Sequence, residues 1–235
     1  MLDESKRVVF FGGAGVSTES GIPDFRSADG LYNQEYAFPP EEIISRSFFN
    51  ANTSEFYRFY RNKMLFLEVK PNSAHIVLAE LEIPVITQNI DGLHQAAGSS
   101  QVHELHGSVH KNYCMRCNVF ADLETMVHLI DASDDYIPKC PVANCGGVMK
   151  PAVVLYEEPL DQTVWSAAQE LVEHADTLVV GGTSFVVYPA ASMIQYFSGR
   201  NLVFINKQML DFKQYSNFNV LQINDAIGQV FQNLQ

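Results

Sequence analysis

The four cysteines of the chain fall into two pairs, Cys114-x2-Cys117 and Cys140-x4-Cys145, separated by 22 residues. Four thiolates in two close pairs suit a tetrahedral Zn²⁺ site, and a closed sphere of four sulfurs leaves no position for water or substrate. The spacing therefore predicts one structural zinc ion. Buried or redox-active cysteines are the alternative, and a catalytic thiol is disfavoured because every cysteine has a place in the metal site.

Two glycine turns follow apolar runs and could bind phosphate. The run Val8–Phe11 leads into GGAGVS at residues 12–17, and Val179-Val180 leads into GGTS at residues 181–184. Glycines at the end of a strand let backbone N–H groups approach a phosphate. Thr18 stands where the dehydrogenase fingerprint has its third glycine, and no predicted strand carries the acidic residue expected about 20 positions later. The pattern favours a nucleotide site over nicotinamide redox chemistry, with plain structural turns as the alternative.

Polar side chains gather in the segment 87–94, TQNIDGLH, directly after an apolar run. Gln88, Asn89 and Asp91 are suited to hydrogen-bond a ribose or an amide. An Asx turn followed by a helix cap explains the same residues.

A histidine and one short segment are further candidates for a functional site. His106 precedes Gly107 and could act as an exposed base, because an imidazole titrates near pH ~6.5. His103 could join it on a metal, but no acidic or cysteine ligand stands at a suitable spacing. The segment Gly21–Arg26, GIPDFR, could fold over a ligand as a lid or form a surface turn.

Short apolar runs bounded by turn residues would form the sheet that positions these side chains. They are Val8–Phe11, Pro84–Thr87, Ala152–Leu155, Thr177–Val180, Leu202–Ile205 and Val220–Ile223. Continuous runs of this kind are typical of strands buried on both faces. Helical patterns over residues 73–81 and 163–174 lie between some of the runs. This alternation predicts an α/β fold with a doubly wound parallel sheet.

Two segments interrupt the alternation. Residues 31–70 are rich in aromatic side chains at helical spacing, and residues 111–150 hold all four cysteines. We expect these segments to pack together as a smaller lobe, with a helical module and a zinc-binding module. The segments 1–30, 71–110 and 151–235 would form the larger domain.

Composition and charge exclude several classes of function. Fifteen Lys and Arg against 27 Asp and Glu give a net charge of −12, and no basic run is present, so neither nucleic acid nor an anionic membrane is expected as a partner. No apolar run approaches the ~20 residues that span a bilayer, and the N-terminal apolar stretch is too short for a signal peptide. With 47% hydrophobic residues the chain can build a core. We expect a cytoplasmic protein with reduced cysteines.

Taken in order, these motifs resemble the sirtuin family over essentially the whole chain. The motifs are GAGVSTESGIPDFRS (13–27), TQNIDGLH (87–94), the pair His106-Gly107, the two cysteine pairs, GTS (182–184) and Ile205-Asn206. The resemblance implies a Rossmann-like NAD-binding domain, an inserted smaller zinc-binding and helical lobe, and an active site between them.

The resemblance also implies an activity, the removal of acyl groups from lysine side chains with consumption of NAD. The acyl oxygen attacks the ribose carbon that bears nicotinamide, nicotinamide leaves, and a histidine accepts a proton from the ribose hydroxyls. The products are free lysine, nicotinamide and 2′-O-acyl-ADP-ribose. Protein mono-ADP-ribosyl transfer and a non-enzymatic, zinc-stabilised NAD sensor are the alternatives, and the presence of His106 and Asn89 disfavours the sensor.

Individual roles follow from the same resemblance. His106 would be the general base, and Asn89 would position the ribose and a neighbouring water. Ile90 and Asp91 would hold the nicotinamide carboxamide, and Phe25 would shield the ribose carbon from water. The other expected NAD-binding residues are Ala14, Gly15, Thr18, Ile22, Arg26, Gln88, Gly182, Thr183, Ser184, Asn206, Asp225 and Ile227.

Substrates would be acyl-lysine proteins or peptides that add as a strand between residues 154–158 and 185–189. The family often has Phe-Gly-Glu where this chain has Tyr156-Glu157-Glu158, which would change how the first segment sits. Family members that prefer acidic acyl groups carry Tyr-x-x-Arg, whereas the register here gives Tyr57-x-x-Tyr60. We therefore expect neutral acyl groups, acetyl and longer chains, in preference to succinyl or malonyl.

Overall fold

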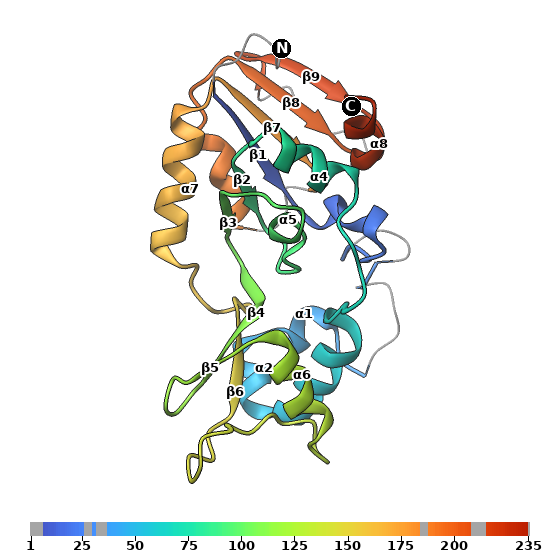
Figure 1. The fold of residues 1–235 in the computed structure, drawn as a ribbon. Coiled ribbons are helices and arrows are strands. Elements are labelled where there is room, and N and C mark those ends of the chain that lie inside the picture. Colours follow the sequence, from blue (N-terminus) through green and yellow to red (C-terminus); the bar gives the residue numbers. More distant parts are fainter. Residues whose placement is uncertain (1–6, 26–29, 32–36, 184–187, 208–214, 235) are drawn as a thin grey trace.

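The computed structural model describes residues 7–25, 30–31, 37–183, 188–207 and 215–234. Its upper part in Figure 1 is a six-stranded sheet in which all neighbouring strands are parallel. The strands are β1 (Val8–Gly12), β2 (Val85–Thr87), β3 (Val102–Glu104), β7 (Thr177–Gly181), β8 (Asn201–Ile205) and β9 (Asn219–Ile223). Their order is β3-β2-β1-β7-β8-β9. This is the Rossmann arrangement of two halves that diverge from a central pair, and it confirms the predicted fold class.

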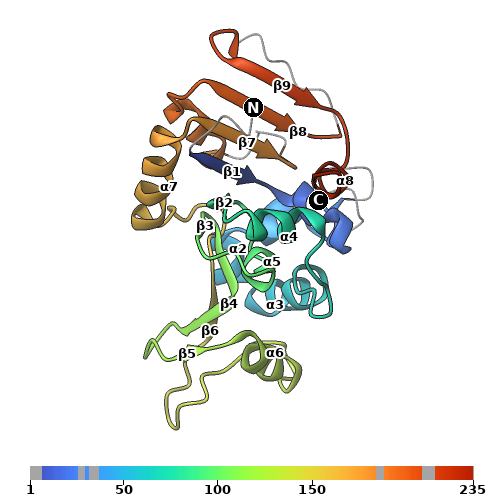
Figure 2. The ribbon, with the colours of Figure 1, turned by 45° about the horizontal axis from the view of Figure 1, so that its top comes forward.

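Helices cover both faces of this sheet. Val9 and Phe11 of β1 pack in a core with α7 (Gln162–His174) and η6 (Ala190–Tyr196). Phe10, on the opposite face, packs in a core with α4 (Ser73–Glu80) and α8 (Ile227–Gln232). Figures 1 and 2 show α7 on one side of the sheet and α4 and α8 on the other. Burial on both faces explains why the predicted strands are continuous apolar runs.

Side-chain hydrogen bonds cap the N-termini of the two covering helices α4 and α7. The side chain of Asn72 accepts a hydrogen bond from the N–H of Ala74, and its own N–H donates to Nδ1 of His75, which makes a capping box at α4. Asp161 caps α7 by accepting from the N–H of Thr163 over 2.8 Å.

The lower part of Figure 1 contains a second, antiparallel sheet and a group of helices. Its strands are β4 (Gly107–Cys114), β5 (Phe120–Ala121) and β6 (Met149–Val153), in the order β5-β4-β6. The helical elements are α1 (Pro40–Ile43), α2 (Arg46–Ala51), α3 (Thr53–Phe59), the π-helical turn η5 (Tyr60–Met64) and α6 (Leu123–Asp131). Aromatic residues of α2 and α3, such as Phe49 and Phe56, share one core with Met126 and Met149. Residues of the aromatic and the cysteine-bearing segments thus share one core.

One predicted strand lies in a different sheet from the one expected. The run Ala152–Leu155 was expected in the parallel sheet, but Ala152 and Val153 end β6, which pairs antiparallel with β4. The run is apolar because its alternate residues, Val153 and Leu155, belong to the core of the lower part. The division into two lobes stays a prediction, and two of its limits, 110/111 and 150/151, fall inside β4 and β6.

No helix in the described part of the chain combines the length and the apolar character that a membrane span requires.

Candidate active site

A cavity of about 1060 Å³ lies at the carboxyl ends of the parallel strands. β1 and β7 are neighbours, and the chain proceeds from them in opposite directions across the sheet, which makes their carboxyl ends the switch point where such folds bind ligands. Every described residue expected to bind NAD lines this cavity: Ala14, Gly15, Thr18, Ile22, Phe25, Gln88, Asn89, Ile90, Asp91, His106, Gly182, Thr183, Asn206, Asp225 and Ile227. Arg26 and Ser184 lie outside the described residues.

The two glycine turns meet backbone to backbone at the switch point. The N–H of Gly15 donates to the carbonyl of Gly182 over 2.8 Å, and the N–H of Gly13 donates to the carbonyl of Gly181 over 3.2 Å. A Cβ on Gly15 would stand 2.8 Å from the Cα of Gly182, and Gly182 has a left-handed φ of +59°. Both turns therefore require glycine, and they bring η2 (Ala14–Val16) to the edge of the cavity.

Ser17 joins Asn89 and Asp91 behind the first glycine turn. Its hydroxyl donates to Asp91 over 2.7 Å and accepts from Nδ2 of Asn89 over 3.0 Å. The other oxygen of Asp91 accepts from the N–H of Leu93, the first residue of α5 (Leu93–Ala96), over 2.9 Å. Ser17 is only 1% exposed and lines the cavity. No motif of the sequence singled out Ser17, although it stands close behind the glycine turn.

A second polar group links β2, β7 and β8. Nε2 of Gln88 donates to the hydroxyl of Thr183 over 3.3 Å, and Nδ2 of Asn206 donates to the carbonyl of Thr183 over 2.9 Å. Because all three residues follow the carboxyl ends of parallel strands in the same sheet, their remaining polar atoms are placed for a ligand that lies across the sheet edge.

His106 immediately precedes β4 and lies 3.0 Å, through Nδ1, from the backbone carbonyl of Gln88. A carbonyl oxygen can only accept, so Nδ1 of the neutral ring carries the proton and Nε2 is the basic nitrogen. Burial lowers the pKa of His106 below its usual value of 6.5, and the hydrogen bond to Gln88 opposes that shift. The imidazole is thus neutral and oriented at neutral pH, as a general base must be.

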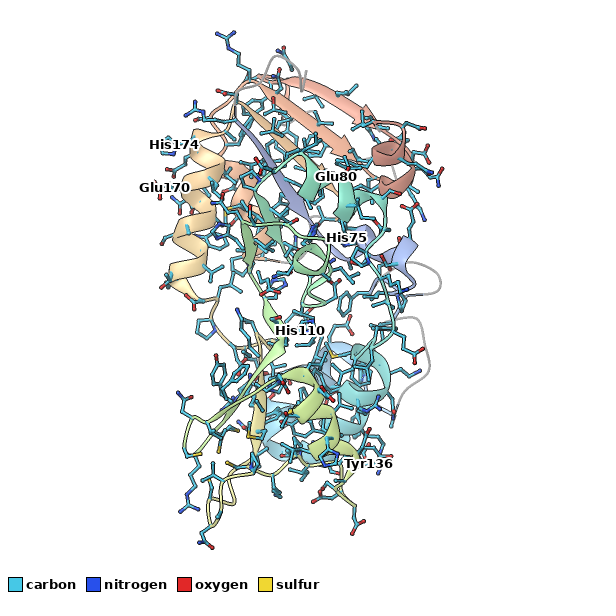
Figure 3. The ribbon with its side chains drawn as sticks, viewed as in Figure 1. His75, Glu80, His110, Tyr136, Glu170 and His174 are labelled. Carbon is cyan, nitrogen blue, oxygen red and sulfur yellow. The ribbon has the colours of Figure 1, made fainter. Side chains whose placement is uncertain are left out.

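The other histidines have different environments. His110 lies between the two parts of the molecule (Figure 3) and also lines the cavity, with Nε2 3.1 Å from the carbonyl of Asp91. No motif of the sequence singled it out. His94 is 1% exposed and packs against His75 with the two rings tilted, and His103 lies in β3. The described structure places neither His94 nor His103 in the cavity lining.

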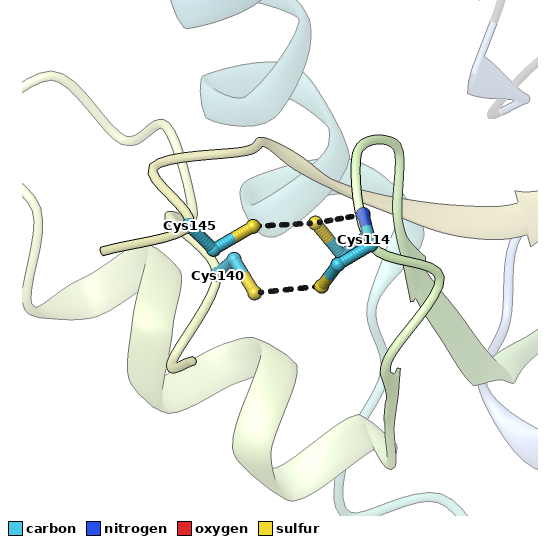
Figure 4. A group of neighbouring side chains, drawn as sticks. Cys114, Cys140 and Cys145 are labelled. Atoms are coloured by element: carbon cyan, nitrogen blue, oxygen red, sulfur yellow. Dashed lines mark hydrogen bonds between the residues drawn. The ribbon is translucent and has the colours of Figure 1, made fainter. Parts of the chain in front are cut away.

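The four cysteines converge at the far end of β4 (Figure 4). Their sulfurs all lie within 4.8 Å of one another, with 3.6 Å between Cys114 and Cys145 and 3.5 Å between Cys117 and Cys140. Four sulfurs at ~2.3 Å from a tetrahedral Zn²⁺ would be ~3.8 Å apart, so the cluster fits this ion. The N–H of Arg116 points at the sulfur of Cys114 over 3.4 Å, as expected for a thiolate ligand.

Comparisons with known proteins point to one family. The family model described as "Sir2 family" matches residues 13–189. The chain is 51% identical to an NAD-dependent protein deacetylase of Clostridium acetobutylicum, covering 99% of this chain and 94% of that protein. It is 45% identical to an NAD-dependent protein deacetylase of Cutibacterium acnes, covering 100% of this chain and 94% of that protein.

Solved structures show the same likeness. A Sir2 structure with a p53 peptide and NAD⁺ superposes with a TM-score of 0.84 at 36% identity, covering 99% of this chain and 93% of that one. A Sir2 structure bound to an acetylated peptide gives a TM-score of 0.85 at 35% identity, with the same coverage. The family model, the relatives and the solved structures therefore agree that the chain belongs to the Sir2 family.

Proposed function

We propose that this protein is an NAD-dependent protein lysine deacylase that transfers a neutral acyl group, acetyl above all, from lysine to ADP-ribose. One observation carries the proposal. The imidazole of His106 lines the same cavity as the glycine turns and the Ser17–Asn89–Asp91 group. The hydrogen bond between Nδ1 and the carbonyl of Gln88 fixes the ring, so that Nε2 is its basic nitrogen. A protein that only bound a nucleotide would not need a positioned base.

The cavity fits NAD by size and by the chemistry of its walls. Its 1060 Å³ exceed the volume of most small-ligand sites. Ala14, Gly15 and Thr18 would face the phosphates at the switch point, Gln88, Gly182, Thr183 and Asn206 the phosphates and riboses, and Asp225 and Ile227 the adenine. Ser184 and Arg26 are part of the proposed site by resemblance only. Bound NAD supplies an electrophilic ribose carbon with nicotinamide as the leaving group.

The residues of the chain would orient the bound NAD and accept a proton from its ribose. His106 would accept a proton from a ribose hydroxyl at Nε2. Asn89, held by Ser17, would position the ribose and a water. Ile90 and Asp91 would hold the carboxamide, and Asp91 is kept in place by Ser17. Phe25, which packs against the core of the lower part, would cover the ribose carbon and exclude water, and Ile22 would belong to the same lid.

The peptide would add to the segment 154–158. Among the described residues no backbone hydrogen bond engages the carbonyl of Val154 or the N–H of Glu157, and both residues line the cavity. Tyr188 and Pro189 also line it, while residues 185–187 of the second expected segment lie outside the described residues. Strand addition uses backbone groups of this kind and leaves sequence preference loose.

The environments of Arg58 in α3 and Arg61 in η5 support a neutral acyl group. Arg61 forms two hydrogen bonds with Asp131, and Arg58 pairs with Glu55, so both guanidinium groups are engaged with other acidic side chains. Tyr57 and Tyr60 are fully buried in the core. Neither arginine lines the cavity, so neither is placed to bind a succinyl or malonyl carboxylate.

The cysteine cluster would hold one Zn²⁺ with a structural role, because four thiolates close its coordination sphere. A cytoplasmic location belongs to the same proposal, since thiolate ligands persist in a reducing compartment. Neither nucleic acid nor a membrane is proposed as a partner, in view of the net charge of −12.

The test is nicotinamide release from NAD by the purified protein, with and without an acetyl-lysine peptide, beside a His106→Ala variant. We expect release that depends on the peptide and is lost in the variant. Label transfer from NAD to protein would instead indicate an ADP-ribosyltransferase. Bound NAD without release, for any acylated peptide, would indicate a sensor and overturn the proposal.

A further inference from the structure

The segment Val154–Glu158 bridges the two parts of the molecule and is tied to both. At one end the N–H of Val154 donates to the carbonyl of His106 over 2.9 Å. At the other end Tyr156 donates through its N–H to Ile44 and accepts from the N–H of Arg46, both over 3.0 Å. A peptide strand added here is therefore placed relative to the proposed base by the way this segment is fixed.

Glu157 fixes the far end of the segment with its side chain. One carboxylate oxygen accepts from the N–H of Ser47 over 2.9 Å, and the other accepts from the hydroxyl of Ser47 over 2.8 Å. Ser47 lies in the first turn of α2. Both donors belong to Ser47, which lies 110 residues away in the chain, so the contact joins the bridging segment to the helical module.

The backbone of Glu157 makes this contact unusual. Its φ is +73°, in the left-handed region that favours glycine. A side chain at this position is strained, and the chain nevertheless carries a carboxylate with two hydrogen bonds there. The combination indicates that the side chain contributes something that a glycine would not.

The neighbouring Glu158 has a different environment. Its carboxylate pairs with Lys150 over 3.1 Å and with Arg46 over 3.0 Å, and it accepts from the N–H of Leu155 over 2.9 Å. Removing Glu158 would leave two partly buried cations unpaired. Glu157 is exposed, so its substitution leaves no buried charge without a partner. A change at Glu157 therefore tests the anchor more directly than a change at Glu158.

We propose that Glu157 is a positioning residue for the acyl-lysine peptide, because its carboxylate anchors the peptide-binding segment to α2 and so holds that segment in the position to which the peptide adds. The inference rests on the proposed function. The residues expected to hold NAD after β1, β2 and β7 are fixed by their own hydrogen bonds, so the anchor acts on the peptide and not on NAD.

Three variants separate the carboxylate from the backbone. Glu157→Ala removes the anchor and keeps a side chain at positive φ, Glu157→Gly removes the anchor and relieves the strain, and Glu157→Gln keeps an oxygen that can accept from Ser47. We expect the peptide KM to rise about tenfold in the Ala and Gly variants, the size expected when a hydrogen-bonded carboxylate is lost. The Gln variant should restore it to within about threefold. The kcat and the KM for NAD should change less than about twofold.

The matched control is Glu55→Gln, which neutralises an exposed carboxylate on α3 that pairs with Arg58 and not with the bridging segment. Its peptide KM should equal that of the wild type. Binding of a labelled acetyl-lysine peptide, measured by fluorescence anisotropy, gives a readout that is independent of turnover. Thermal unfolding of each variant shows whether it is folded.

Three outcomes would overturn the inference. The first is an unchanged peptide KM in both the Ala and Gly variants. The second is a rise in the Ala variant alone, which would assign the effect to backbone strain. The third is an equal rise of both KM values together with a lower unfolding temperature, which would show a general structural role. A wild-type protein that neither binds nor deacylates the peptide would refute the proposed function itself, before any variant is compared.

Discussion

The hydroxyl of Ser17 donates a 2.7 Å hydrogen bond to the carboxylate of Asp91, which lies 74 residues further along the chain. The same oxygen accepts from Asn89, so one buried hydroxyl orients two residues proposed to contact NAD.

Ser17→Ala should lower kcat/KM for NAD about tenfold, because it leaves part-buried polar groups without a partner. Steady-state nicotinamide release measures this. Ser133→Ala removes an exposed hydroxyl from Asp135 and serves as the control; equal effects in both variants would contradict the prediction.

The rate should depend on pH through His106. Burial lowers the pKa of this imidazole below 6.5, and a general base works only when it is unprotonated. The value of kcat/KM should therefore rise with pH, with an inflection below pH 6.5, and be level at neutral pH. The profile of a His110→Gln variant should keep the same inflection, since Nε2 of His110 contacts Asp91 and not the proposed base position. An acid limb centred above neutral pH would refute this assignment.

A buried histidine pair should make folding stability depend on pH. His75 and His94 are at most 1% exposed, with ring centroids 4.6 Å apart, and burial lowers their pKa values to about 4 and about 3. In the unfolded chain both titrate near 6.5, so their stabilising contribution is complete above that pH. It is lost progressively as the pH falls below 6.5, because only the unfolded state then takes up protons.

Urea unfolding at pH 7 and pH 5 tests this effect. Each histidine that stays neutral in the folded state should cost about 2 kcal/mol of unfolding free energy at pH 5. His94→Phe should remove about half of the loss, since no described residue hydrogen-bonds either ring nitrogen of His94. His174→Gln alters an exposed ring and should leave the difference in unfolding free energy between pH 7 and pH 5 unchanged. A stability that is equal at the two pH values would exclude the buried neutral pair.

Removal of zinc should unfold the lower part of the molecule. Cys114, Cys140 and Cys145 belong to the same core as the aromatic residues of α2 and α3, and the exposed Cys117 completes the cluster, so four unshielded thiolates would disrupt that core. We expect one zinc per chain by metal analysis, and a chelator should lower the unfolding temperature and abolish nicotinamide release. Cys117→Ser should behave like the chelated protein. A fully stable protein without bound metal would contradict the zinc assignment.

The sequence predicts the central strands well because burial on both faces demands continuous apolar runs, as in β1 and β7. It does not predict β3, whose residues Val102–Glu104 are only half-buried at the edge of the sheet. It assigns Ala152–Leu155 to the wrong sheet because an apolar run does not encode which partner it pairs with. Pairing depends on tertiary contacts, here with β4.

The candidate site is predictable where a motif carries both geometry and chemistry. The glycine turns, the segment 87–94 and the cysteine pairs are of this kind, and the structure brings each set together. Ser17 and His110 were missed because single polar residues have no spacing signal. The departure at Glu157 was visible in the sequence, but neither its positive φ nor its contact with Ser47 could be derived without the fold.

β4 begins one residue after His106 and ends at Cys114. An eight-residue strand is roughly 25 Å long, which is well beyond the Debye length of about 10 Å at ordinary ionic strength. At that separation the metal centre makes no contact with the imidazole, and the strand links the two through position, as a rigid spacer does. Exchanging zinc for another tetrahedral divalent ion of similar radius should leave the pH profile of the enzyme where it was.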